Sequence, residues 1–167
     1  MPTTSEFRLI AAPQAEVWAA ITDLKAAARW NQVWQRIEFL SSQREGVDTT
    51  FRAHTEDGLA HDFRISEWAP EEYVAFAPLP RQEPEEQRYL ITLESQSFLL
   101  EPVGDDHTNV TLSATAAGHG LRGWLAARFV WPGYQRQGLR RALDALQALF
   151  EPTEGDEEPE AEGPTEG

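Results

Sequence analysis

The strongest constraint on this chain is a run of alternating apolar and polar residues from Val33 to Ala117. Alternation with a period of two is typical of strands that bury one face. Six strands are predicted in this run, at residues 33–40, 49–54, 59–68, 73–77, 87–101 and 108–117, and the segment 87–101 is either one long strand or a bent pair. They are separated by turns such as Asp57-Gly58, whose residues suit the positive φ angles of a tight hairpin. Successive hairpins of this kind predict an antiparallel meander.

The segments on either side of the run predict one more strand and three helical stretches. A strand is expected at residues 5–10, with Phe7 and Leu9 on one face. Pro13 suits the start of a first helix, which carries apolar residues at helical spacing through Leu24, and a second short helix follows at 24–29. The last helix is predicted at 121–150, where an apolar stripe occupies one side. Pro132-Gly133 should kink or split it, because proline removes a backbone donor.

The order of these elements, β-α-α-β-β-β-β-β-β-α, predicts an α+β domain over residues 1–150. One face of an antiparallel sheet must be covered, and only one long amphipathic helix is available to do this. A single helix cannot fill the concave side of a strongly bent sheet of about seven strands. The pattern therefore predicts an internal cavity, unless side chains meet across the gap.

Charge divides the chain into two parts. The formal net charge is −14, and residues 151–167 hold eight acidic residues and no basic one. This tail has no large apolar residue and is predicted to be disordered, as a solubilising end rather than a partner-binding segment. Residues 1–150 carry about −6. A negative domain repels phosphates, so nucleic acid and anionic membrane surfaces are not expected partners.

Most sequence features that would indicate a cellular location, a metal or a cofactor are absent. There is no membrane-spanning apolar run, no basic-then-apolar signal segment and no cysteine, so a cytoplasmic protein is expected. No metal-ligand spacing, nucleophile elbow or phosphate-binding loop is present. Neither a metal nor a cofactor is therefore expected, and no pattern points to a particular oligomeric state.

Four short motifs resemble the opening of the START-like superfamily, which includes polyketide cyclase/dehydrase-like proteins, START lipid-transfer domains and the birch-pollen allergen group. They are Pro13-x-x-x-Val17-Trp18, Ile21-Thr22-Asp23, Arg29-Trp30-Asn31 and Gly46 before a strand. The resemblance covers about residues 3–150. It implies a helix-grip fold, in which a curved antiparallel sheet wraps around the last helix and encloses an apolar cavity. It does not fix a function, because one fold hosts many.

Aromatic and apolar residues supply the candidate ligand-binding positions. Strand alternation places several on the inward face, and the resemblance puts the entry to the strand region near the cavity mouth. Tryptophan suits such a site, although core packing is the more common explanation for any single one. The candidates are Trp30, Trp34, Phe51, His61, Phe63, Phe76, Tyr89, Leu112, Trp124 and Trp131.

Three functions fit these observations. The first is binding of a hydrophobic small molecule, such as a lipid, isoprenoid or polyketide-like compound, in the cavity. The second is a cyclase/dehydrase-type enzyme, with His61 and Tyr89 as weak catalytic candidates. His61 can also be read as a histidine at a strand end without a catalytic role. The third is a non-catalytic interaction module that works through the acidic tail.

Overall fold

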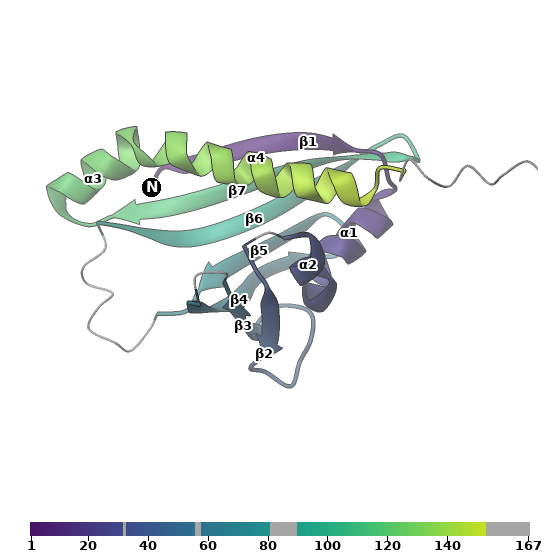
Figure 1. Ribbon diagram of the computed structural model, residues 1–167, viewed down its shortest axis with the longest axis horizontal. Coiled ribbons are helices and arrows are strands. Elements are labelled where there is room, and N and C mark those ends of the chain that lie inside the picture. The colour runs from purple at the N-terminus through teal and green to yellow at the C-terminus, as the bar shows by residue number, and fades with distance from the viewer. Residues whose placement is uncertain (32, 56–57, 81–89, 153–167) are drawn as a thin grey trace, which may run out of the picture.

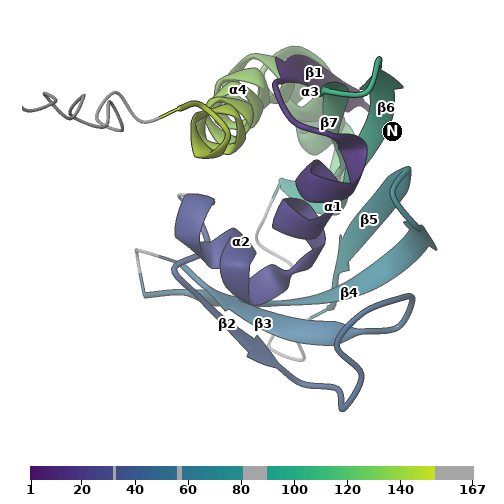
Figure 2. The same ribbon diagram turned by 90° about the vertical axis from the view of Figure 1, so that its right-hand side faces the viewer.

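The computed structural model describes residues 1–31, 33–55, 58–80 and 90–152. Within these ranges, seven strands form one antiparallel sheet in the order β1-β7-β6-β5-β4-β3-β2. The sheet curves into an arc, with β1 at one end and β2 at the other (Figure 2). The four helices lie on the hollow side of this arc (Figure 1). The predicted α+β helix-grip architecture is confirmed.

The strands lie close to their predicted positions. Their bounds are β1 Thr3–Ile10, β2 Arg36–Phe39, β3 Thr50–His54, β4 Ala60–Ala69, β5 Tyr73–Pro78, β6 Ile91–Val103 and β7 His107–Gly118. Two strands begin later than predicted: β6 begins at Ile91 rather than at residue 87, although residues 87–89 lie outside the described ranges, and β2 begins at Arg36 rather than at residue 33. The side chain of Asn31 accepts a hydrogen bond from the backbone N–H of Val33 at 3.0 Å. This local turn occupies the residues that alternation assigned to the strand.

Two pairs of helices frame the sheet. The first pair is α1 (Gln14–Thr22) and α2 (Leu24–Trp30), which follow β1 directly. Asp23 separates them and caps α2, because its carboxylate accepts a hydrogen bond from the N–H of Ala26 at 3.2 Å. The second pair is α3 (Gly120–Phe129) and α4 (Trp131–Leu149). The predicted terminal helix is thus split, and Pro132 lies in the first turn of α4, where its missing donor is tolerated.

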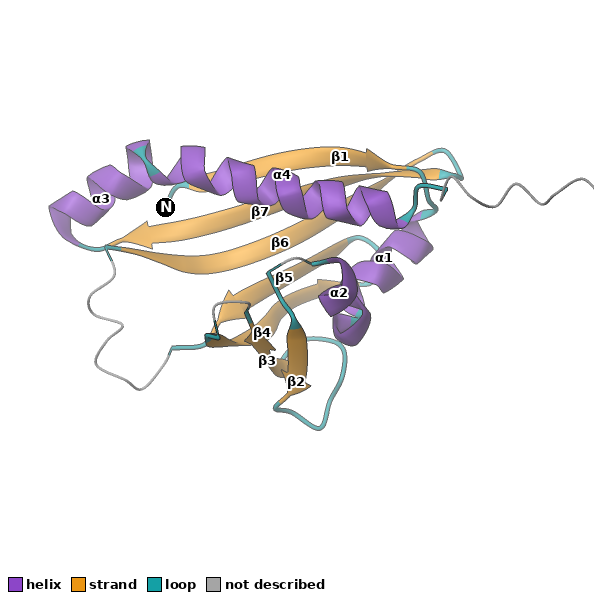
Figure 3. Ribbon diagram, viewed as in Figure 1, coloured by secondary structure: helices purple, strands orange, loops and turns teal. Residues whose placement is uncertain are grey.

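Helix α4 lies along β1, at one end of the arc (Figure 3). Its stripe of Leu139, Leu143 and Leu146 is fully buried in the core. At the helix margin, the carboxylate of Glu6 on β1 lies 3.2 Å from Arg140, and Arg8 pairs with Asp144. Hydrophobic packing and ion pairs therefore hold α4 against the edge strand.

In strand β1, the face that points toward the core is the one that does not carry Phe7 and Leu9. Phe7 and Leu9 do share a face, but that face is exposed to solvent. Thr4 and Ile10 are buried on the other face, which they share with the partly exposed, ion-paired Glu6 and Arg8. Charged residues on the inward side also protect an edge strand from pairing with another chain.

Candidate ligand site

An aromatic cluster covers the hollow side of the sheet where β3, β4 and β5 meet. The ring of Trp34 lies 5.5 Å from Phe51, 5.6 Å from Phe63 and 5.9 Å from Phe76, measured between ring centroids. Phe98 extends the cluster onto β6, 6.3 Å from Phe76. All five side chains are buried. The structure therefore brings four predicted site residues together, and at this end of the hollow they pack against one another.

The two tryptophans near the start of the strand region differ in their surroundings. Trp34 lies in the loop before β2 and covers the aromatic cluster. Trp30 ends α2, and its indole N–H donates to the carbonyl oxygen of Ala20 in α1 at 2.9 Å. That hydrogen bond joins two adjacent helices. Trp30 therefore has a structural role in the form observed, as the core-packing interpretation expects.

A row of directly paired residues crosses the hollow side of the sheet from β1 to β4, and we call it the inner row: Thr4, Ala114, Gln96, Phe76 and Ile65. Directly paired residues in antiparallel strands share a face, so all five point into the hollow. Four of them are buried. Gln96 is partly exposed, although β6 is a central strand. An inward side chain on a central strand reaches solvent only where the hollow is incompletely covered.

Polar and small side chains concentrate in the part of the inner row that lies on β1, β7 and β6. The hydroxyl of Thr4 is buried and has no hydrogen-bond partner in the described structure. A buried hydroxyl without a partner is unusual and calls for an explanation. Ala114 lies between Thr4 and Gln96 and fills little space. Leu93 of β6, which pairs with Ala116, and Trp131 of α4 are partly exposed and pack against the hydrophobic core.

Thr4 and Gln96, the polar residues of the inner row, are not among the residues that the sequence predicts for the site. Gln96 alternates with Phe98 and Leu100, so its inward position could have been found from the sequence. Thr4 could not, because the apolar pair Phe7 and Leu9 indicates the opposite face of β1. The β6 bulge between Leu93 and Ser95 further shifts the alternation.

The remaining predicted residues are spread over several environments. Leu112 is fully buried on β7 and pairs with Glu6 and Phe98. His61 shares the face of Phe63 but lies at the start of β4, where it is exposed. Trp124 of α3 is 55% exposed. Tyr89 lies outside the described residues.

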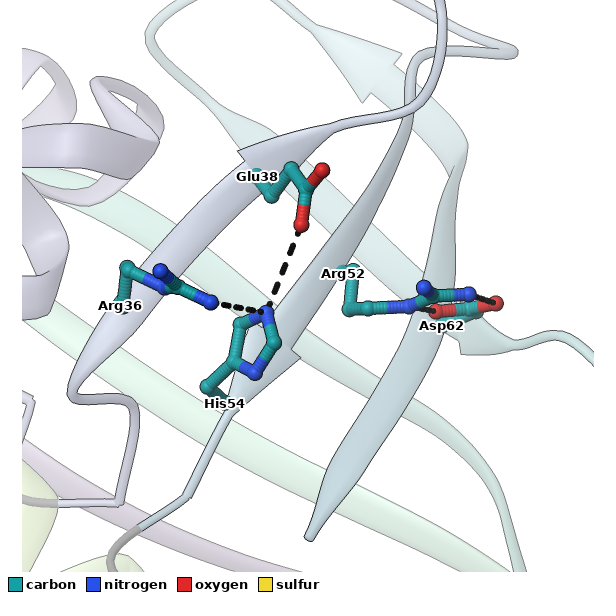
Figure 4. Close-up of polar contacts among 5 residues, drawn as sticks. All are labelled: Arg36, Glu38, Arg52, His54 and Asp62. Atoms are coloured by element: carbon teal, nitrogen blue, oxygen red, sulfur yellow. Dashed lines mark hydrogen bonds and ion pairs between the residues drawn. The ribbon is translucent and has the colours of Figure 1, made fainter. Parts of the chain in front are cut away.

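Polar residues of β2, β3 and β4 gather on the outer face of the sheet (Figure 4). His54 Nε2 lies 3.2 Å from Arg36 and 3.5 Å from the carboxylate of Glu38. Arg52 donates two hydrogen bonds to Asp62, at 2.7 and 2.9 Å. The hydrogen bonds and negative charge of Asp62 raise the pKa of Arg52 above its ordinary value. These side chains lie on the face of the sheet opposite the aromatic cluster and form a surface network of hydrogen bonds and ion pairs.

An open hollow of about 650 Å³ lies elsewhere, between the junction of α1 with α2 and the loop before β3. Trp18 and Phe39 give it an apolar floor, while Asp23, Lys25 and Arg44 give it a charged margin. The guanidinium of Arg44 stands 4.4 Å from the centre of the Phe39 ring. This hollow is a surface feature, separate from the inner row.

Among the residues that the structure describes, no group of three or more His, Asp or Glu side chains is arranged to hold a metal ion. No helix within the described ranges is long and apolar enough to cross a bilayer.

Comparisons with known proteins agree with the fold. A family model described as "Polyketide cyclase / dehydrase and lipid transport" matches residues 1–151. No curated protein gives a significant match. Among solved structures, protein MLL2253 from Mesorhizobium loti superposes with a TM-score of 0.64 at 19% identity, covering 89% of this chain and 96% of that one. CV1439 from Chromobacterium violaceum gives 0.61 at 18% identity, with 90% and 97% covered.

A further similar structure is the di-domain ARO/CYC protein BexL from the BE-7585A biosynthetic pathway. Its TM-score is 0.70 at 15% identity, with 91% of this chain and 48% of BexL covered. At such low identities these likenesses concern the fold alone.

Proposed function

The chain belongs to the polyketide cyclase/dehydrase and lipid transport family, and from this premise we propose that it binds a hydrophobic small molecule (a lipid, isoprenoid or polyketide-like compound). The site that we propose lies between the inner row and the helices α3 and α4. Its floor is Ala114, its polar groups are Thr4 and Gln96, and Leu93 and Trp131 stand at its margin.

One observation carries this proposal: on the hollow side of the sheet, the central strand β6 is incompletely covered around Gln96, and the edge strand β1, two strands away, carries the unpartnered hydroxyl of Thr4. Binding sites for small molecules are mostly apolar, with a few polar groups that orient the ligand. Thr4 and Gln96 lie two strands apart, which corresponds to about 9–10 Å across the sheet. A ligand with one polar end could engage either group while its apolar body lies over Ala114.

The sequence predicts that the residues of the aromatic cluster bind the ligand, whereas in this proposal most of them form a wall of the site. Its rings contact one another, so in the form observed they close one end of the hollow. We propose that Phe76, which belongs to both the cluster and the inner row, contacts the ligand. Trp34, Phe51 and Phe63 then form the wall behind it, and Leu112 packs beneath.

Uptake of a fluorescent fatty-acid probe tests the proposal. The wild-type chain should bind the probe, and Ala114→Leu should abolish binding because the larger side chain fills the floor of the site. Ala117→Leu is the matched control, since Ala117 pairs with Thr92 on the opposite face of the same strand. Gln96→Leu leaves the packing volume similar and should change the affinity for probes that differ only in their polar end.

Absence of uptake by the wild-type chain, together with no organic-extractable compound in the purified protein, would overturn the proposal. Equal binding by Ala114→Leu and Ala117→Leu would move the ligand away from the inner row. Circular dichroism of each variant separates loss of the site from loss of the fold.

The family description also favours a second candidate, a cyclase/dehydrase-type enzyme. His61 and Tyr89 are its predicted catalytic residues, and the exposed position of His61 at a strand end gives this role little support. Unchanged turnover by His61→Ala, once a substrate is identified, would remove His61 from the mechanism.

The third candidate, an interaction module, depends on the acidic tail, nearly all of which lies outside the described residues. Its test is whether a chain lacking residues 151–167 retains its partners in a pull-down.

A further inference from the structure

Helix α3 exposes large apolar side chains and buries small ones. Leu121 is 75% exposed, Trp124 55% and Phe129 73%, whereas Gly123 and Ala127 are buried against the sheet. At about 100° per residue, Leu121, Trp124 and Phe129 fall on the side of the helix opposite Gly123 and Ala127. Val130 and Tyr134 continue the exposed apolar surface into α4, at 68% and 80% exposure.

The position of α3 is fixed by backbone contact rather than by these side chains. A Cβ atom added to Gly123 would lie 2.3 Å from the carbonyl oxygen of Leu90, and one added to Gly118 would lie 2.3 Å from that of Gly123. Such close approach is possible only for glycine. The backbone of α3 therefore packs closely against the end of β7 (Figure 1). Its large apolar side chains are exposed to solvent.

The charge on this part of the chain is opposite to that of the chain as a whole. The sequence from His107 to Leu143 contains no acidic residue, while residues 120–141 contain Arg122, Arg128, Arg136, Arg140 and Arg141. Arg122 and Arg128 are exposed on α3. The average of about −6 for the domain, which argued against anionic membranes, conceals this local positive charge.

We propose that the exposed face of α3, which we define as Leu121, Arg122, Trp124, Arg128 and Phe129, docks on an anionic lipid bilayer. A helix that combines apolar and aromatic side chains with arginines matches the boundary between lipid tails and phosphate headgroups. Arginine stems lie along the apolar region while the guanidinium groups reach the phosphates. The indole of Trp124 suits the same boundary, with its apolar ring and single polar donor.

The same charges disfavour a second copy of this chain as the occupant. In a symmetric pair, each copy would bring Arg122 and Arg128 against the same arginines of its partner. Like charges placed together across an interface weaken association. The acidic residues 151–167 complement the arginines, but they offer no large apolar side chain to Leu121 and Phe129.

Flotation with vesicles tests the proposal on the full chain, using phosphatidylcholine alone or mixed with an equal part of phosphatidylglycerol. The wild-type chain should bind the mixed vesicles at low salt and bind pure phosphatidylcholine weakly. Arg122→Glu/Arg128→Glu should weaken binding by on the order of tenfold or more. Lys25→Glu/Arg29→Glu on α2 makes the same change in net charge at exposed positions, and should have a much smaller effect.

A second pair of variants separates apolar insertion from charge. Leu121→Ser/Phe129→Ser should lose vesicle binding, whereas Phe7→Ser, at the 71% exposed Phe7 of β1, should retain it. Probe uptake in vesicle-free solution should be unchanged in Leu121→Ser/Phe129→Ser, so failure of docking and failure of the ligand site give different results.

The proposal is overturned if wild type fails to float, or if the α3 variants float like wild type. A solution dimer that Leu121→Ser/Phe129→Ser dissociates would also overturn it, because a second copy would then be the occupant.

Discussion

Helices α3 and α4 follow one another in one helical stretch of sequence, yet they use their side chains in opposite ways. Helix α4 buries three leucines and exposes its arginines, as expected for a helix that covers a sheet. Helix α3 buries Gly123 and Ala127 and exposes its large apolar residues. Both helices contact the same sheet.

The difference shows that an apolar residue in a helix does not by itself mark the core side. What decides the orientation of α3 is the space available: the end of β7 admits only a helix backbone without a Cβ atom at Gly123. The sheet beneath α4 leaves room for leucine side chains. The large apolar residues on α3 therefore add little to the core, and the variants below compare the two helices.

The largest effect is expected from shortening a buried leucine of α4. Leu143 is 0% exposed, so Leu143→Ala should lower the free energy of unfolding by about 2–5 kcal/mol through lost contacts and a residual cavity. Phe129→Ala on α3 removes a larger side chain, but it should change stability by no more than about 0.5 kcal/mol, because that side chain is exposed. Urea unfolding followed by circular dichroism measures both. A comparable loss in the two variants would show that Phe129 is buried in solution.

A smaller effect is expected from adding one methyl group where α3 meets the sheet. Gly123→Ala places a Cβ 2.3 Å from the Leu90 carbonyl oxygen, so α3 must shift, with a loss of about 1–3 kcal/mol. Gly138→Ala in α4 is the matched control, since no atom lies within 4 Å of its added Cβ. That control should stabilise the chain by about 0.5–1 kcal/mol through helix propensity. A neutral Gly123→Ala would mean that α3 is not held by this contact.

The contrast also shows which parts of the molecule could be predicted from the sequence. The strand run, the buried leucine stripe and the break at Pro132-Gly133 follow from local patterns, and the fold follows from their order. Which side of α3 faces outward does not follow from a local pattern, because it depends on a long-range contact between Gly118, Gly123 and Leu90.

The candidate site was less predictable for the same physical reason. Alternation correctly places Phe51, Phe63 and Phe76 on one face, but it cannot show that Trp34 lies over them from a loop. Nor can it show that Thr4 is brought beside Ala114, since β1 and β7 lie at opposite ends of the domain sequence. Which side chains close the hollow is decided by tertiary packing.

The smallest effect is expected at the charged margin of α4. The Glu6 carboxylate is 18% exposed and lies 3.2 Å from Arg140 and 3.9 Å from Arg136. Glu6→Gln retains the shape but removes the charge, so the free energy of unfolding should fall by about 1 kcal/mol or less, and by still less at high salt. Glu38→Gln, on the exposed outer face, is the control and should be neutral. If Glu6→Gln instead matched Leu143→Ala, ion pairing rather than apolar burial would hold α4 in place, and its contrast with α3 would need another explanation.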